Sequence, residues 1–148
     1  MKLLCTAVFT LAITTASFAD IYQYSDCDGN GTLLLTELDA EPGVDLSGHY
    51  LGCADLFYAN LAYANLTDAD LTDVDLYNAD LTDADLTGVS SGGISGRPWF
   101  LPTNWQFTKG YLIGPQANLY NADLSGANLS GANLENADLY SHITHTFH

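Results

Sequence analysis

Residues 51–86 decide the fold, and they read LGCADLFYANLAYANLTDADLTDVDLYNADLTDADL. A leucine recurs at every fifth position of this stretch, and the residue two places before most of these leucines is alanine. Asp or Asn stands between the two in nearly every repeat. The period extends towards the N-terminus and returns after an interruption, so that fourteen leucines follow it: Leu46, Leu51, Leu56, Leu61, Leu66, Leu71, Leu76, Leu81, Leu86, Leu119, Leu124, Leu129, Leu134 and Leu139.

A five-residue period fits neither of the regular amphipathic structures. Leucines five apart would occupy every face of an α-helix, and they would alternate between the two faces of a flat strand. The period suits a chain that turns a corner once per repeat, with Leu and the preceding Ala pointing inwards. Four such corners complete one coil, and successive coils would stack at roughly 4.8 Å. We therefore expect Phe57 to stack on Tyr77, Tyr120 on Tyr140, and Asp55 to lie beside its counterpart in the next coil.

The pattern Ala-[Asp/Asn]-Leu-x-x resembles the pentapeptide-repeat family, as in ADLFY at residues 54–58 and ANLTD at residues 64–68. Clear repeats cover residues 44–88 and 117–141. The resemblance implies an all-β fold, a right-handed quadrilateral β-helix (a pentapeptide-repeat solenoid) with an inserted loop. The period alone implies only a corner every fifth position.

Residues 1–19 have the features of a secretory signal peptide: Lys2 precedes an apolar run that ends in small residues. The run is too short, and the sequence after it too acidic, for a membrane anchor. We therefore expect a secreted or periplasmic protein with an N-terminal cap at residues 20–45. Cys27 and Cys53 remain after processing, and a cysteine pair in an exported chain is compatible with one disulfide.

The chain is strongly acidic, with 18 Asp and Glu residues against three Lys and Arg and a net charge of -15. Such a surface repels nucleic acid and anionic lipid, so we expect neither as a partner and no membrane insertion. It would attract cations, basic proteins or a protein site built for DNA, or it simply keeps the protein in solution. Some pentapeptide-repeat proteins act as DNA mimics in the DNA channel of gyrase, a topoisomerase. That alternative conflicts with export, because gyrase is cytoplasmic.

Residues 26–37, DCDGNGTLLLTE, fit the pattern of an EF-hand calcium loop. The ligands in this interpretation would be Asp26, Asp28, Asn30, the backbone carbonyl of Thr32, and Glu37. The flanking segments are too short for the two helices of an EF-hand, and Asp-Gly and Asn-Gly are also strong turn signals. The motif therefore predicts either a weak calcium site in a calcium-stabilised surface protein or a hairpin turn.

Residues 87–116 break the five-residue period and contain both tryptophans and three of the four prolines. We expect the solenoid, residues 46–141, to be interrupted by an aromatic insert at about 97–110 that includes a short projecting hairpin. Aromatic rings beside an arginine favour recognition of a partner. The alternative is that the rings fold back and seal the flank of the solenoid. The candidate contact residues are Arg97, Trp99, Phe100, Trp105 and Phe107.

No catalytic constellation stands out in the sequence. Residues 88–92 match G-x-S-x-G, but no helix is expected after them, as a nucleophile elbow requires. His142, His145 and His148 could converge on a metal, although a frayed terminal tail is the commoner explanation. We therefore predict no enzyme activity and no certain cofactor, calcium being the one candidate.

The tail at residues 142–148 offers little to cover the end of the solenoid. Either Ile143 and Phe147 fold over the last coil, or two chains meet end to end as a homodimer through the C-terminal coil. Our functional prediction is a non-catalytic exported scaffold or binding module, whose unknown partner is a protein or a component of the cell envelope.

Overall fold

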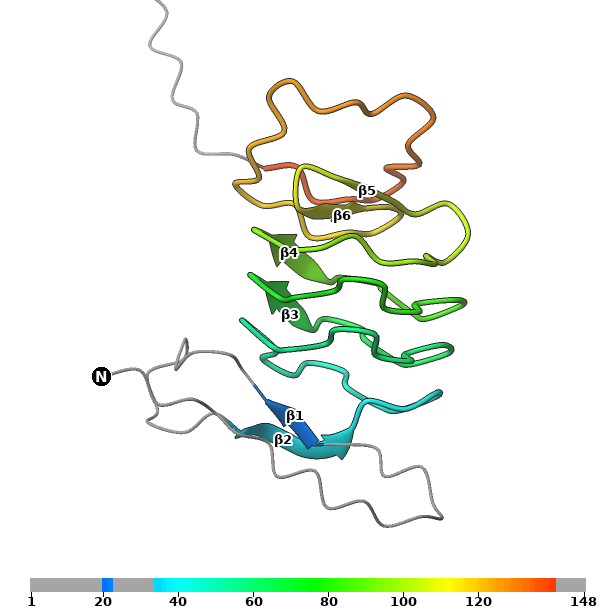
Figure 1. The fold of residues 1–148 in the computed structure, drawn as a ribbon. Coiled ribbons are helices and arrows are strands. Elements are labelled where there is room, and N and C mark those ends of the chain that lie inside the picture. The colour runs from blue at the N-terminus through cyan, green and yellow to red at the C-terminus, as the bar shows by residue number, and fades with distance from the viewer. Residues whose placement is uncertain (1–19, 23–33, 141–148) are drawn as a thin grey trace, which may run out of the picture.

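The computed structural model describes residues 20–22 and 34–140 of the 148-residue chain. Its regular elements are short strands: β1 (Asp20–Tyr22), β2 (Leu34–Asp39), β3 (Asp70–Thr72), β4 (Ser90–Gly92), β5 (Gln106–Thr108) and β6 (Tyr111–Ile113). From β2 onwards the chain winds upwards through a stack of coils (Figure 1). Within the described ranges no helix has the length and apolar character that crossing a membrane requires.

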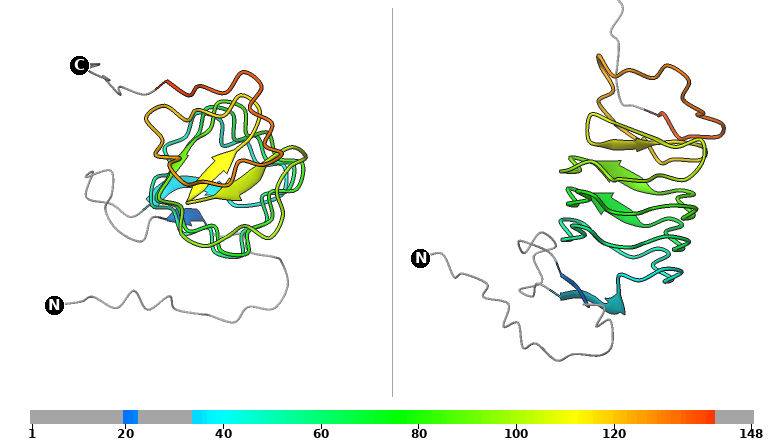
Figure 2. Two further views of the ribbon diagram at one scale, coloured as in Figure 1. Left: turned by 90° about the horizontal axis from the view of Figure 1, so that it is seen from above. Right: turned by 45° about the vertical axis from the view of Figure 1, so that its right-hand side comes forward.

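Successive coils are joined in parallel register, each residue pairing with its counterpart four repeats further along the chain. Asp45 pairs with Asn65, and Asn65 pairs in turn with Asp85. Strands β3 and β4 form a longer parallel pair, with Leu71 opposite Ser91. The cyan and green coils superpose closely when the stack is seen from above, whereas the orange C-terminal coil is displaced from them (Figure 2, left). The predicted pairing of each residue with its counterpart four repeats further on is therefore confirmed for this part of the chain.

The predicted neighbours across coils are also found. Asp55 pairs with Asp75 in parallel. The rings of Phe57 and Tyr77 stack with their centroids 5.3 Å apart. Further up the stack, the rings of Tyr120 and Tyr140 lie 5.9 Å apart.

Each corner is a β-turn with a left-handed residue in its third position. In residues 51–54 the Ala54 N–H donates to the Leu51 carbonyl at 2.9 Å, and Cys53 between them has a φ of 59°. Positive φ at the third position is what a type II turn requires. The Asp or Asn before each leucine supports the corner, as where Asp75 Oδ1 accepts a hydrogen bond from the Tyr77 N–H at 2.9 Å. This local bond explains why the repeat uses Asp or Asn at that position.

The inward residues of the first coils form one continuous core. The leucines from Leu46 to Leu86 and most of the alanines two places before them are buried. Strand β1 closes the N-terminal end of this core, because Ile21 is only 1% exposed and packs within the core cluster. The Tyr22 carbonyl also accepts a hydrogen bond from the Asp55 N–H at 2.8 Å.

The leucines of the C-terminal repeats, residues 117–140, are less buried than those of the first coils. Leu119 is buried, but Leu124, Leu129 and Leu134 are only half-buried and Leu139 is 50% exposed. Each coil in the stack is covered by the next one. The half-buried leucines pack against a second, smaller core cluster instead.

The insert contains the expected hairpin, but the hairpin does not project. Strands β5 and β6 pair antiparallel across a two-residue turn in which Lys109 and Gly110 have φ values of 52° and 79°. Two successive positive φ values are typical of a type I′ turn. The strands lie across the interior of the coils when the stack is seen from above (Figure 2, left). Leu112 and Ile113 are fully buried, Leu112 in the core below and Ile113 in a second core with Ala117.

A gap in the leucine column makes room for the hairpin. Ser91 lies opposite Leu71 in the coil below, and Gly96 stands where the period would place the next leucine. These small residues leave the interior of the third coil, residues 85–112, unfilled by its own repeats. Leu112 fills that space, and its N–H donates to the Ser91 hydroxyl at 3.1 Å.

The third coil is longer than the others, and the insert was expected to begin at about residue 97. Most of the additional residues lie further along the chain than that. Asp80 still pairs with Phe100, so the expected range of about 97–110 begins inside the regular stack. The next pairing joins Ser90 to Asn118, which is a longer interval along the chain than the regular one. The chain therefore leaves the coil after Phe100, forms the hairpin, and returns to the stack before Asn118.

Candidate functional site

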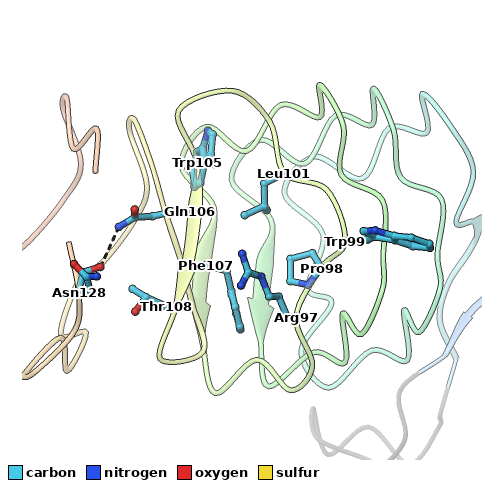
Figure 3. Close-up of a pocket in the computed structure, with 9 residues that line it drawn as sticks. All are labelled: Arg97, Pro98, Trp99, Leu101, Trp105, Gln106, Phe107, Thr108 and Asn128. Carbon is cyan, nitrogen blue, oxygen red and sulfur yellow. Dashed lines mark hydrogen bonds between the residues drawn. The ribbon is translucent and has the colours of Figure 1, made fainter. Parts of the chain in front are cut away.

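A pocket of about 490 Å³ opens on the flank of the stack, where the third coil meets the hairpin. Figure 3 shows its lining, with the guanidinium group of Arg97 near the middle of the labelled side chains. Four of the five predicted contact residues line this pocket. The full lining comprises Arg97, Pro98, Trp99, Leu101, Trp105, Gln106, Phe107, Thr108 and Asn128.

The coil side of the pocket is held by backbone bonds to the coil below. The Arg97 carbonyl accepts a hydrogen bond from the Asn78 N–H at 3.0 Å, and the Trp99 N–H donates to the Ala79 carbonyl at 2.8 Å. Pro98 between them is buried. The Arg97 and Trp99 side chains therefore extend from a backbone that is fixed on both sides of Pro98.

The two interpretations of the aromatic insert each describe a different pair of rings. Trp105 and Phe107 are half-buried and pack against the core, as expected of rings that fold back. Trp99 and Phe100 are 66% and 51% exposed and stack on each other with centroids 5.7 Å apart. Phe100 does not line the pocket but extends its aromatic rim through this stack.

The charge of the pocket is opposite to that of the whole chain. Arg97 is its one charged lining residue, in a chain with 18 Asp and Glu residues. The Arg97 side chain forms neither an ion pair nor a hydrogen bond with any residue that the structure describes. Among the described residues that line the pocket, the Arg97 guanidinium is therefore the one charged group.

Lys109, at the tip of the hairpin, is in a different situation. Its Nζ donates to the Ser125 carbonyl. The Ser125 hydroxyl and N–H, and then Lys109, hold the pKa of Asp123 below its usual value. Lys109 is therefore engaged by the C-terminal repeats, whereas Arg97 is not.

The polar side of the pocket joins the hairpin to the C-terminal repeats. Gln106 Nε2 donates to the Asn128 carbonyl at 3.4 Å, the dashed line in Figure 3. The Thr108 hydroxyl adds a further polar group from β5. The pocket can therefore offer aromatic faces, amides, a hydroxyl and one guanidinium to a ligand.

A second hollow of about 410 Å³ lies against Trp105 and has an acidic lining that includes Asp83 and Asp85. Asp85 Oδ1 accepts a hydrogen bond from the Thr87 N–H at 3.0 Å. This backbone bond and the Thr87 hydroxyl hold the pKa of Asp85 below its usual value, so the carboxylate stays ionised near neutral pH. In the part of the chain that the structure describes, no cluster of three or more His, Cys, Asp and Glu residues could hold a metal ion.

Most of the predicted calcium ligands lie outside the described residues. Glu37 is part of β2, whereas Asp26, Asp28, Asn30 and Thr32 belong to the undescribed range 23–33. The calcium site therefore stays a prediction. The same holds for the signal peptide at residues 1–19 and for the histidines and apolar residues of the tail at 142–148.

Cys53 is disulfide-bonded. Cys27, the partner expected from the sequence, lies outside the described residues. The bond adds a covalent link to the first coil, where Cys53 also occupies the left-handed turn position.

Sequence reasoning found the aromatic residues and Arg97 but missed the polar part of the lining. Gln106 and Thr108 flank Phe107 in β5, and a strand there would have indicated that they share one face. Asn128 gave no local signal, because it is an ordinary repeat residue that reaches the pocket only through stacking.

The family model for pentapeptide repeats matches residues 50–89 and 116–141, in 8 copies. The intervening residues 90–115, which the match leaves out, contain most of the pocket lining. No curated protein and no solved structure matches the chain. The matched repeats coincide with the stacked coils, and the chain belongs to the pentapeptide-repeat family.

Proposed function

We propose that the protein is a non-catalytic, exported binding module. In this proposal a right-handed quadrilateral β-helix serves as a rigid support, and the insert in its third coil binds the partner. The observation that carries the proposal is the flank pocket, where Arg97 and the exposed Trp99–Phe100 pair stand together. Membership of the pentapeptide-repeat family supports a structural or binding role, because repeat solenoids commonly present extended binding surfaces.

The aromatic pair has the character of a recognition site. Trp99 and Phe100 keep more than half of their surface exposed although they stack on each other. Leaving two large rings in water is unfavourable, and burying them against a partner would recover that free energy. Tryptophan and arginine are also the residue types that most often dominate binding energy at interfaces.

Export is supported by two independent features. Residues 1–19 have the composition of a signal peptide. Cys53 is disulfide-bonded, and structural disulfides are typical of oxidising compartments such as the periplasm and the exterior. The expected partner is therefore a protein or another component of the cell envelope.

Capture of envelope components by the purified full-length protein tests the proposal. Deleting residues 97–110 would also remove Trp105 and Phe107 from the core, so substitutions of the exposed pair are preferable. The double variant Trp99→Ala/Phe100→Ala should lose the captured partner. The matched control, Phe57→Ala/Tyr58→Ala, removes another exposed aromatic pair in T-shaped contact and should retain it. Equal capture by both variants would contradict a role for the insert.

A DNA mimic that acts on a topoisomerase is the alternative, favoured by the net charge of -15. The signal-like N-terminal segment and the cationic pocket oppose it. A gyrase supercoiling assay separates the two ideas. If a large excess of the protein does not inhibit gyrase, the binding-module proposal stands. Inhibition would favour the DNA mimic.

Calcium binding at residues 26–37 is a second proposal, compatible with the first. It rests on the match of these residues to the loop pattern. Thermal melting with and without calcium, at constant ionic strength, should show a higher midpoint with the ion. Glu37→Gln should abolish the increase, because it removes the bidentate ligand of the loop. An unchanged midpoint in the wild-type protein would count against the site.

A further inference from the structure

We propose that the flank pocket binds a sugar that carries a carboxylate, such as a uronic acid unit of an acidic polysaccharide, with Arg97 binding the carboxylate. The inference rests on the proposed function, since it names the class of ligand that the insert would bind. Four properties of the pocket support it: its charge, its aromatic lining, its polar groups and its size.

The positive charge is specific to this part of the surface. The acidic surface as a whole repels anions, but the pocket lining contains Arg97 and no Asp or Glu. The Arg97 guanidinium has no protein partner among the described residues. A planar guanidinium matches the geometry of a carboxylate with two parallel hydrogen bonds. A carboxylate is therefore a ligand group that would complete this site.

The aromatic lining favours a ring over a flexible acid. Trp105 and Phe107 are half-buried and pack against the core, while Trp99 forms the exposed edge. An indole face is flat and apolar, and it carries a polar N–H at its rim. The C–H face of a sugar ring can pack on such a surface while its hydroxyl groups point outwards.

The polar groups supply partners for those hydroxyls. Gln106, Thr108 and Asn128 line the pocket beside the rings. Asn128 Oδ1 already accepts a hydrogen bond from the Ser130 N–H at 3.0 Å, which leaves its amide N–H groups to donate. A peptide C-terminus is less suited, because it is usually captured by a nest of backbone N–H groups, whereas side chains supply the donors here.

The size of the pocket is consistent with one or a few sugar units. Its volume of about 490 Å³ lies within the range of roughly 300–1,000 Å³ that is usual for small-ligand sites. The pocket is open to the flank, so a longer chain could continue along the stack beyond Trp99 and Phe100.

Intrinsic fluorescence gives a selective readout, because the two tryptophans of the chain both line this pocket. The full-length protein would be titrated with oligogalacturonate, with a neutral galacto-oligosaccharide of equal length, and with a short peptide that has a free C-terminal carboxylate. We expect a saturable change with oligogalacturonate and at least tenfold weaker binding of the other two.

Variants assign the carboxylate contact to Arg97. Arg97→Gln should weaken oligogalacturonate binding by roughly 10- to 100-fold, the loss expected for a hydrogen bond to a charged group. Arg97→Lys should recover part of the affinity, since it restores the charge but not the planar fork. Lys109→Gln removes the same charge outside the lining and should leave affinity unchanged, with melting curves checking that every variant is folded.

Three results would overturn the inference. Equal affinity for the acidic and neutral sugars would exclude a carboxylate contact. Binding of the peptide but not of the sugar would show that the ligand is a peptide carboxylate. The absence of a fluorescence response to any of the three ligands would contradict a binding site in this pocket. If envelope capture still depended on Trp99 and Phe100 in these cases, the proposed binding module would stand without the sugar.

Discussion

At the scale of single residues, the repeat depends on a left-handed conformation at the third position of each corner. Tyr58, Asp73 and Asn78 adopt positive φ there although they carry a Cβ. Such residues are strained by about 1–2 kcal/mol, which the packed stack must offset. Gly96 has a φ of 70° and approaches the neighbouring coil closely, because a Cβ there would lie 2.6 Å from Tyr77 Cα.

Gly96→Ala should therefore destabilise the protein more than the same change at Gly48. Gly48 also has positive φ, but no atom lies within 4 Å of the position its Cβ would take. We expect Gly48→Ala to cost about 1 kcal/mol from backbone strain, and Gly96→Ala roughly 1–3 kcal/mol more from the contact with Tyr77. Urea unfolding followed by tryptophan fluorescence measures both. Equal losses would mean that the backbone of the second coil shifts easily.

The contribution of the corner carboxylates to stability should depend on their protonation, and Asp85 allows this to be tested. Hydrogen bonds from the Thr87 N–H and hydroxyl lower the pKa of Asp85, so its contribution to stability is present above the unfolded pKa of about 3.9. That contribution is lost as pH falls through the lower folded pKa. Asn keeps the acceptor at every pH, as Asn65 does in the coil below, where it accepts from the Thr67 N–H at 3.1 Å.

The melting temperature of Asp85→Asn relative to wild type should therefore rise as pH is lowered from 6 to about 3. The difference should be constant between pH 6 and 8, where the carboxylate stays ionised. Calorimetry across this range measures it. A difference that does not change with pH would show that the charge of Asp85 contributes nothing to the corner.

At the scale of structural elements, the ladder of Asp and Asn side chains combines a local benefit with repulsion between coils. Asp75 accepts a hydrogen bond from the Tyr77 N–H at 2.9 Å and pairs directly with Asp55 of the coil below. Two like charges about 5 Å apart in water repel by something under 1 kcal/mol. The hydrogen bond contributes about as much in the opposite direction.

Substitutions at Asp75 should separate these two effects. Asp75→Asn keeps the hydrogen bond and removes the repulsion, so it should leave stability unchanged or raise it by less than about 1 kcal/mol. Asp75→Ala removes both and should be about 0.5–1.5 kcal/mol less stable than Asp75→Asn. Denaturant titration at low ionic strength measures the difference. A less stable Asn variant would mean that the charge itself favours the fold.

The sequence predicts the regular elements well because each repeat carries its own information. The spacing of leucines fixes the register of coils, and the Asp or Asn beside them fixes the corners. The path of the hairpin was harder to predict, because it depends on the absence of two leucines from the third coil. Ser91 and Gly96 occupy places where leucines would have filled the interior, and that absence becomes meaningful only when the coils are stacked. The position of Asn128 in the pocket lining was hard to predict for the same reason, because it also depends on how the coils stack.

At the scale of the whole molecule, a net charge of -15 on a small repeat protein makes stability sensitive to salt. Raising the ionic strength from 0.01 to 0.15 M shortens the screening length from about 30 to 8 Å. We expect the melting temperature to rise by several degrees, and equally with sodium and choline chloride. A rise confined to one cation would indicate a specific site. No rise would mean that like charges repel each other as strongly in the unfolded chain as in the folded protein.

We expect the buried hairpin to give the two ends of the stack different rates of opening. Leu112 belongs to the continuous core of the first coils, whereas Ile113 on the other side faces the smaller, half-exposed cluster of the C-terminal repeats. Cooperative units of unequal stability lose amide protection separately. Deuterium should therefore enter the backbone of residues 117–140 well before residues 46–86, and uniform exchange would show that the hairpin transmits unfolding between them.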